Sequence, residues 1–453
     1  MIAQRGANHY TRGMKTERAN DGLIPLDNSA IIYPPTVARY NTHMFRLSVD
    51  VEIEVVEQRL LTALEHVIER FPYFAVSLHS GFFWYYFTAN KKPLAVWPEV
   101  SHPCGFLHRK RGAHGYLFKV FHAPRRIAVE FFHALSDGTG ALIFLKTLVA
   151  EYLRLSGHPV GPDPQIFDLG ESAKEAEWED SFEKRYVPLK SIFGFESHAF
   201  HLKNTSALTD EVQAISGRIA IEELKRISSL HQVTITEYLV AELLDALQRV
   251  QTQEVKNPKR YKPVRISVPV NIRKVFDSVS MRNFTLFVVV GIDPRLGHYE
   301  FGEILTQVVH QLRGSVNAKS LSRQLSRNVA GRRNPLIRYA PFFLKKPFMK
   351  LLSDSYGDAI FSSTLSNLGS VTLPAEMAKL IRRMDFYLSP SKANKVSCAA
   401  IGVNGFVNVN FTSIYERKVD FEREFFTALV NKGIGVEVST NRGSSWPIAS
   451  VAE

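Results

Sequence analysis

Residues 126–155 read RIAVEFFHALSDGTGALIFLKTLVAEYLRL, and their periodicity changes near the middle of the stretch. The residues before His133 are mostly apolar, aromatic or β-branched, which is typical of a buried strand. The residues after Gly138 predict a helix, because apolar side chains recur every three or four positions: Leu142, Leu145, Leu148, Val149 and Tyr152. A histidine therefore stands where a strand ends and a glycine-containing turn leads into a helix.

The pattern His133-Ala-Leu-Ser-Asp137-Gly138 carries the chemical signal of the sequence. An imidazole with a pKa near 6.5 can take a proton from a hydroxyl or an amine at neutral pH, so His133 is a candidate general base. Asp137 could hold the local backbone by hydrogen bonding or pair with a distant arginine. Gly138 could present its backbone N–H to a developing oxyanion. The same residues could also be a buried histidine, a helix N-cap and a turn glycine.

Strands and helices are predicted on both sides of a central irregular stretch, which indicates a mixed α/β fold. Thr234 and Glu237 have the spacing of a capping box before one of the helices. The main expected elements are helices over 55–70, 237–250, 303–316 and 420–433 and strands over 80–89, 115–123, 217–221, 264–270, 284–292, 359–367 and 397–414. We expect an N-terminal lobe over 20–156 that carries the histidine motif, a crossover linker over 157–212 and a C-terminal lobe over 213–453.

The composition excludes several classes of protein. With 453 residues, of which 45% are hydrophobic, the chain is long enough for two to three domains of roughly 150 residues and is too apolar to be disordered. It has no apolar run of about 18 residues and no apolar stretch near its start, so we expect a cytoplasmic protein. Cys104 and Cys398 allow at most one disulfide, and no zinc motif, serine-nucleophile elbow or phosphate loop occurs. Neither metal nor covalent-nucleophile chemistry is expected.

Two further segments add a resemblance to a known family. HxxxDG after an apolar strand, the strand 268–276 (VPVNIRKVF) followed by 281–284 (MRNF), and the string 362–374 (SSTLSNLGSVTLP) together resemble the chloramphenicol acetyltransferase-like, or HxxxD acyltransferase, superfamily. That superfamily includes BAHD acyltransferases, condensation domains, polyketide-associated acyltransferases and alcohol acetyltransferases. Arg273 and Asn283 match its pattern, whereas Arg282 stands where glycine is common.

The resemblance implies an α/β pseudo-dimer of two similar lobes with a tunnel between them. His133 would deprotonate an acceptor, which would attack a thioester carbonyl without an acyl-enzyme intermediate, and Asp137 would pair with Arg273 to shape the histidine loop. No permanently bound cofactor is implied, because coenzyme A enters as the thioester co-substrate. Ser366 and Asn367 of the Ser-Asn-Leu-Gly segment could line the tunnel, donate to the oxyanion or simply form a turn, and Asn283 could likewise be functional or structural.

Most of the net charge of +12 comes from one region. No Asp or Glu occurs between Ile304 and Ser353, where the basic residues are Arg313, Lys319, Arg323, Arg327, Arg332, Arg333, Arg338, Lys345, Lys346 and Lys350. Large apolar residues are mixed with them, which favours an amphipathic element over a nucleic-acid-binding surface. Residues 313–350 could contact coenzyme A phosphates, an acidic acyl carrier protein or an anionic membrane, or they could be a solvated face.

Three functions remain open from the sequence. The first is acyl transfer from acyl-CoA or a carrier-protein thioester to a small-molecule alcohol, or less readily to an amine. The second is a stand-alone condensation enzyme that forms amide bonds between carrier-bound substrates. Phe132 counts against it, because that branch usually has a second histidine at this position. The third is a degenerate member that binds a ligand without catalysis, against which the intact His133, Asp137 and Gly138 argue.

Overall fold

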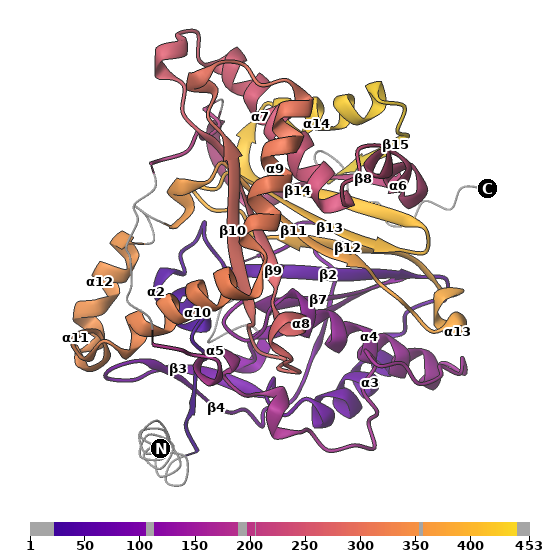
Figure 1. Ribbon diagram of the computed structural model, residues 1–453. Coiled ribbons are helices and arrows are strands. Elements are labelled where there is room, and N and C mark those ends of the chain that lie inside the picture. The colour runs from indigo at the N-terminus through magenta and orange to yellow at the C-terminus, as the bar shows by residue number, and fades with distance from the viewer. Residues whose placement is uncertain (1–21, 106–112, 189–196, 204, 353–356, 442–453) are drawn as a thin grey trace.

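The computed structural model describes residues 22–105, 113–188, 197–203, 205–352 and 357–441, and Figure 1 shows it. Residues 20–21 and 442–453, the two outer ends of the expected lobes, lie outside these ranges. The strands form a five-stranded sheet, a seven-stranded sheet and a small three-stranded sheet of β1 (Ile24–Pro25), β4 (Tyr85–Ala89) and β3 (Val76–Ser80). The predicted α/β class is confirmed.

The five-stranded sheet belongs mainly to the first half of the chain. Its strands, in spatial order, are β12 (Ile381–Leu388), β2 (Met44–Val51), β7 (Arg126–Phe132), β6 (Phe118–Ala123) and β5 (Val96–Pro98). The neighbouring strands β2 and β7 are buried along their whole length, because helices cover the sheet and the second half of the chain packs on it. The covering helices are α3 (Glu57–Arg70) and α4 (Gly138–Leu155), which the apolar periodicity predicted.

The seven-stranded sheet belongs to the second half. Its order is β10 (Thr285–Ile292), β9 (Val264–Asn271), β11 (Ser363–Ser370), β13 (Val396–Val403), β14 (Phe406–Arg417), β8 (Thr205–Ala220) and β15 (Val436–Thr440). In Figure 1 three long helices lie together over this sheet: α7 (Ile235–Glu254), α9 (Phe301–Ser315) and α14 (Asp420–Asn431). The predicted capping box is present, since Thr234 and Glu237 exchange hydrogen bonds at the start of α7.

The sheets depart from the expected lobe boundaries in two places. β12 follows residue 213 but pairs with β2 in the first sheet, and β8 begins at residue 205, inside the expected linker. β12 is also hydrogen-bonded to the second sheet. The side-chain N–H groups of Asn408 and Asn410 on β14 donate to the Met384 and Phe386 carbonyls at 2.7 and 3.0 Å. The two lobes therefore share β12, and a simple division at residue 213 is wrong for this strand.

The described part of the crossover contacts both lobes, since the Glu177 carboxylate pairs with Arg70 of α3 at 2.7 Å and the Glu177 carbonyl accepts the backbone N–H of Met281. It contains the short helix α5 (Ser181–Lys184), and the basic helix α10 (Ala318–Arg333) lies beside it. Arg332 and Arg333 of α10 form ion pairs with Asp180 and Glu183 at 3.2 and 2.7 Å. Part of the basic region therefore neutralises the acidic crossover. The remaining helices are α2 (Tyr33–Thr36), α6 (Ile221–Leu230), α8 (Arg273–Phe276), α11 (Pro335–Tyr339), α12 (Phe342–Leu352) and α13 (Ala375–Ala378).

Within the described ranges, no helix combines the length and apolar character that crossing a bilayer requires. Cys104 and Cys398 are both buried free thiols, so the single disulfide that the sequence allowed is absent.

Candidate active site

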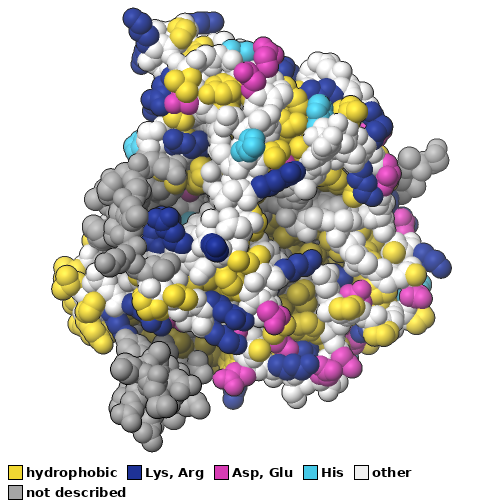
Figure 2. Space-filling view, viewed as in Figure 1, with side chains coloured by type: hydrophobic (Ala, Val, Ile, Leu, Met, Phe, Trp, Pro, Cys, Tyr) yellow, Lys and Arg dark blue, Asp and Glu magenta, His cyan; other side chains and the backbone are white. Residues whose placement is uncertain are grey.

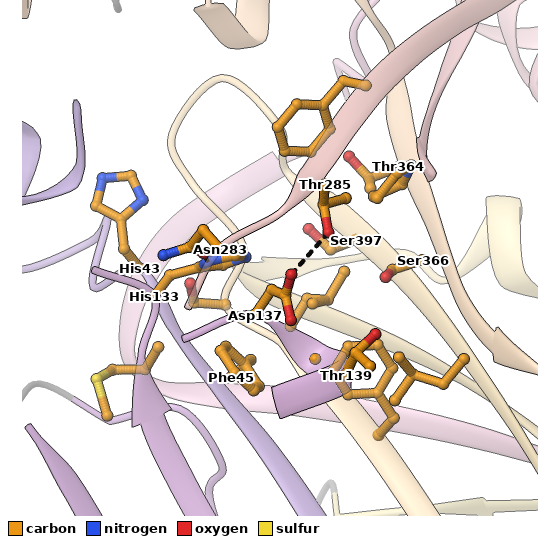
Figure 3. Close-up of a pocket in the computed structure, with 18 of the residues that line it drawn as sticks. His43, Phe45, His133, Asp137, Thr139, Asn283, Thr285, Thr364, Ser366 and Ser397 are labelled. Atoms are coloured by element: carbon orange, nitrogen blue, oxygen red, sulfur yellow. Dashed lines mark hydrogen bonds between the residues drawn. The ribbon is translucent and has the colours of Figure 1, made fainter. Parts of the chain in front are cut away.

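His133 lies at the junction of the two lobes, directly after β7 and before α4. It borders a cavity of about 180 Å³ whose wall comes from both sheets. Figure 3 shows the arrangement, with Phe45 on the side of the first lobe and Thr285, Thr364 and Ser366 on the side of the second. Because the strand ends at the lobe junction, the side chain that follows it is presented to this cavity.

Aromatic rings and one amide hold the imidazole of His133. The Tyr33 ring stacks on it with the ring centroids 4.6 Å apart, and Phe45 meets it edge-on at 5.2 Å. Nδ1 of His133 donates to Oδ1 of Asn283 at 3.0 Å, which leaves Nε2 with its lone pair. Burial lowers the pKa of His133 below 6.5, although the nearby Asp137 charge opposes this shift. At neutral pH the ring is therefore an uncharged proton acceptor.

A second contact fixes the orientation of Asn283. Its Nδ2 donates to Oδ2 of the fully buried Asp27 at 3.3 Å, so the amide oxygen is turned toward the imidazole. Asp27 also accepts the backbone N–H of Ala30 at 2.7 Å, which fixes the carboxylate. Asp27 was not predicted from the sequence, because its Asp-Asn-Ser neighbourhood signals a turn and nothing in it points to a histidine more than 100 residues away.

The predicted pairing of Asp137 with Arg273 is present. The guanidinium donates to both carboxylate oxygens, at 2.8 and 3.0 Å. The remaining bonds to the carboxylate come from the backbone N–H groups of Gly140 and Phe284 and from the Thr285 hydroxyl, which Figure 3 marks with a dashed line. Burial acts to raise the pKa of Asp137, but the Arg273 charge and these hydrogen bonds together lower it. Asp137 is thus a buried carboxylate that joins the histidine loop to the second lobe.

Gly138 and Gly140, in the first turn of α4, pack closely against the second lobe, and the backbone contact at Gly140 leaves no room for a side chain. A Cβ at Gly138 would lie 2.9 Å from a Leu368 methyl, and a Cβ at Gly140 would lie 2.4 Å from the Met281 carbonyl oxygen. The Ser136 hydroxyl donates to the same Met281 oxygen at 2.6 Å. The turn therefore touches the loop of the second lobe directly. Gly138 also lines the central cavity at the first position of α4.

Ser366 and Asn367 both lie on β11 and border the central cavity. The Asn367 amide donates to the Thr236 hydroxyl at 3.0 Å, and its oxygen accepts the N–H of Gly369 at 2.8 Å. Asn367 thus helps to shape the register shift between Asn367 and Ser370 in β11 and connects this strand to α7. Ser366 presents its side chain at the cavity in Figure 3.

Arg282, which replaces the glycine common in the family, does not adopt a positive φ. Its side chain is buried and donates to the carbonyls of Pro25 and Trp178 at 2.6 and 3.3 Å. Its Nε lies 3.5 Å from Asp27 Oδ2. The arginine therefore connects the loop that carries Asn283 to the N-terminal segment and the crossover.

Two larger cavities adjoin the central one. A cavity of about 480 Å³ shares Pro269, Asn271 and Asn367 with it. Another of about 340 Å³ shares Tyr33 and His43, among other residues. The central cavity therefore has two neighbouring cavities, of which the first is lined by residues of the second lobe alone and the second by residues of both lobes. Within the described part of the chain, no three His, Cys, Asp or Glu side chains lie close enough together to hold a metal ion.

The fold and this site define a protein of two lobes with a histidine beside the cavity between them. No protein-family model and no curated protein sequence matches the chain. Solved structures do match it, and they confirm the fold that the resemblance implied.

TRI101 of F. sporotrichioides, crystallised with coenzyme A and T-2, aligns with a TM-score of 0.60 and 11% identity over 93% of this chain and 100% of its own. The trichothecene 15-O-acetyltransferase TRI3 of Fusarium sporotrichioides aligns with a TM-score of 0.57 and 10% identity over 90% of this chain and 93% of its own. A condensation domain of the enacyloxin polyketide synthase aligns with a TM-score of 0.51 and 13% identity over 96% of this chain and 84% of its own.

Proposed function

We propose that the protein is an acyltransferase that moves an acyl group from acyl-CoA to the hydroxyl of a small-molecule alcohol. One observation carries the proposal: a neutral imidazole with its Nε2 lone pair borders a cavity that two larger cavities adjoin. Such a position allows one substrate to approach from each side. Two relatives support the choice of substrates, since one was crystallised with coenzyme A and another is an O-acetyltransferase.

The proposed reaction needs one base and one site for the oxyanion. His133 Nε2 takes the proton of the acceptor hydroxyl as the oxygen attacks the thioester carbonyl. The carbonyl oxygen gains negative charge, which the Gly138 N–H at the start of α4 and the Ser366 hydroxyl stabilise. The C–S bond then breaks, and the imidazolium returns the proton to the departing thiolate. No acyl-enzyme forms, and the enzyme ends in its starting state.

The other residues position this machinery. Asn283 holds Nδ1–H, and Asp27 holds Asn283, so that the lone pair stays on Nε2. Asp137 and Arg273 keep the turn after His133 in shape through their buried ion pair. These groups touch neither substrate in the proposal, and they act through the geometry of the imidazole and of Gly138.

A carrier-protein thioester is the alternative donor, and amide formation between carrier-bound substrates is the alternative reaction. We retain both alternatives because one of the structural neighbours is a condensation domain. Phe132, fully paired in β7, stands where a second histidine would be expected for that reaction. A rate that depends on an added carrier protein, with free acyl-CoA present, would select this alternative.

The direct test is a screen of acyl-CoA donors against pooled alcohols and amines, read as free-thiol release and as product mass. We expect an ester product with at least one donor. His133→Ala should lower turnover by about 10²–10⁴ with its circular dichroism unchanged, while His310→Ala, at an exposed position of α9, should retain full turnover. If the folded His133→Ala variant turned over as fast as the native protein, His133 would not be the base. If the native protein transferred no acyl group at all, a non-catalytic ligand-binding protein would be favoured.

A further inference from the structure

An exposed apolar surface lies away from the catalytic cavity, at the end of the basic region. Three segments form it: the loop between β3 and β4, α11, and the first turn of α12. The large side chains and their exposed fractions are Phe82 66%, Leu336 83%, Tyr339 62%, Phe343 69% and Leu344 58%. We call these five residues the apolar face. In Figure 2 hydrophobic side chains gather at the left edge of the molecule, where Figure 1 places α11 and α12.

Specific contacts hold the three segments together. The Lys345 ammonium is buried, lies 3.6 Å from the centre of the Trp84 ring, and donates to the carbonyls of Phe83 and Arg338 at 3.0 and 3.2 Å. The backbone N–H of Phe342 donates to the carbonyl of Phe82 at 2.8 Å. Burying an ammonium is costly unless its hydrogen bonds are made. The fold therefore fixes these segments in place while their apolar side chains point outward.

The charged side chains of α10, α11 and α12 are all basic. Lys346 is exposed on α12, and Arg323 and Arg327 are exposed one turn apart on α10. The sequence contains no Asp or Glu from Ile304 to Ser353, which covers α10, α11 and α12. A large apolar surface flanked by cations complements a membrane surface that carries anionic lipids.

We propose that the apolar face is a docking surface for an anionic membrane. Aromatic and leucine side chains would enter the interface while the neighbouring cations contact lipid phosphates. A second copy of this chain is a poorer occupant, because a symmetric contact would bring together the basic helices of both copies, which contain no Asp or Glu of their own. The proposal does not depend on the chemistry of the site, since the surface lies outside the cavity lining.

The place of this surface suggests a use that rests on the proposed function. α12 contacts α2, and residues 357, 358, 360 and 361, a few positions after α12, line the 340 Å³ cavity beside His133. Docking through the apolar face would bring that cavity close to the lipid. A lipid-soluble alcohol could then reach the base without crossing water.

Vesicle flotation tests the docking without any turnover. We expect the full chain to float with phosphatidylcholine vesicles that contain phosphatidylglycerol, and to bind them at least tenfold more tightly than phosphatidylcholine alone. Leu336→Ser/Phe343→Ser should weaken binding tenfold or more, and Lys346→Glu by about fivefold or more, because each basic residue near an anionic surface contributes roughly this factor. Leu230→Ser is the matched control, since Leu230 is 72% exposed on α6, which Figure 1 shows on the opposite side of the molecule.

Equal flotation of the Leu336→Ser/Phe343→Ser variant, or no preference for the anionic vesicles, would overturn the proposal. So would a concentration-dependent dimer in light scattering that these two substitutions abolish, because the face would then belong to a second copy. Circular dichroism of each variant separates lost docking from lost folding. If the protein floats with the vesicles but transfers no acyl group, the proposed function is wrong and the proposed docking surface is supported.

Discussion

Arg273→Met removes one partner of the buried ion pair that joins the histidine loop to the second lobe. In the native protein the Arg273 guanidinium donates to both Asp137 oxygens and to the carbonyls of Ser280 and Arg282, at distances from 2.6 to 3.0 Å. Methionine fills much of the same volume but leaves the carboxylate buried without its countercharge. Removing one partner of a buried pair costs about 3–5 kcal/mol, and we expect the free energy of unfolding to fall by that amount at pH 7.

The size of this effect should depend on pH. The pKa of Asp137 lies below its usual 3.8 in the folded protein, so the stability that the pair contributes is complete above about pH 4 and is lost as the pH falls through the folded pKa. In the variant the pKa of the uncompensated carboxyl rises, and protonation relieves the buried charge. The difference in stability between native protein and variant should therefore narrow as the pH is lowered from 7 toward 4.

Urea unfolding followed by tryptophan fluorescence measures both effects. Lys225→Met, which removes an exposed ion pair with Glu222, should change the free energy of unfolding by no more than about 1 kcal/mol. Asp137→Asn in the Arg273→Met background should recover part of the loss, because no stranded charge remains. A loss below about 1 kcal/mol for Arg273→Met, or a loss that does not depend on pH, would refute the structural role of the pair.

Three further predictions concern the loop and the base. Asn283→Ala, which removes the acceptor for His133 Nδ1–H, should lower kcat about 10–100-fold with little change in KM. Asp27→Asn should give a smaller decrease in kcat. Unchanged kcat in both variants would exclude the proposed positioning of the imidazole. Gly140→Ala should destabilise the protein by about 1–3 kcal/mol in urea unfolding, since its Cβ would meet the Met281 oxygen, and full stability would contradict that packing. The kcat/KM profile should stay level from pH 8 to 6.5 and decline only at lower pH, because burial lowers the pKa of His133 and the protonated ring cannot act as a base; a decline that begins above pH 6.5 would contradict this.

The sequence predicted the local half of this site. β7 and α4 follow from a change in periodicity that spans only 30 residues, and this change places His133 at a strand end. The ion pair between Asp137 and Arg273 was predicted through resemblance, not from spacing. β7, α4 and the position of His133 can be predicted from local sequence because strand and helix periodicities repeat over a few residues.

The contacts that complete the site depend on long-range pairing. Asp27 and Arg282 meet from positions 255 residues apart, and β12 joins a sheet made by the other half of the chain. No local pattern encodes such a neighbour, since strand order and loop contacts are settled by packing of the whole chain. In the sequence, Arg282 departs from the pattern of the superfamily that the chain resembles, in which glycine is common at this position. In the structure this arginine secures the loop that carries Asn283.

The proposed function depends on transfer of the acceptor hydroxyl proton to His133 Nε2. A crystal structure with coenzyme A and an alcohol product or acceptor bound measures this directly. We predict the hydroxyl oxygen within about 3.2 Å of Nε2, with Nδ1 still bonded to Asn283. An acceptor hydroxyl held more than about 6 Å from Nε2, with no bridging water, would show that His133 is not the base.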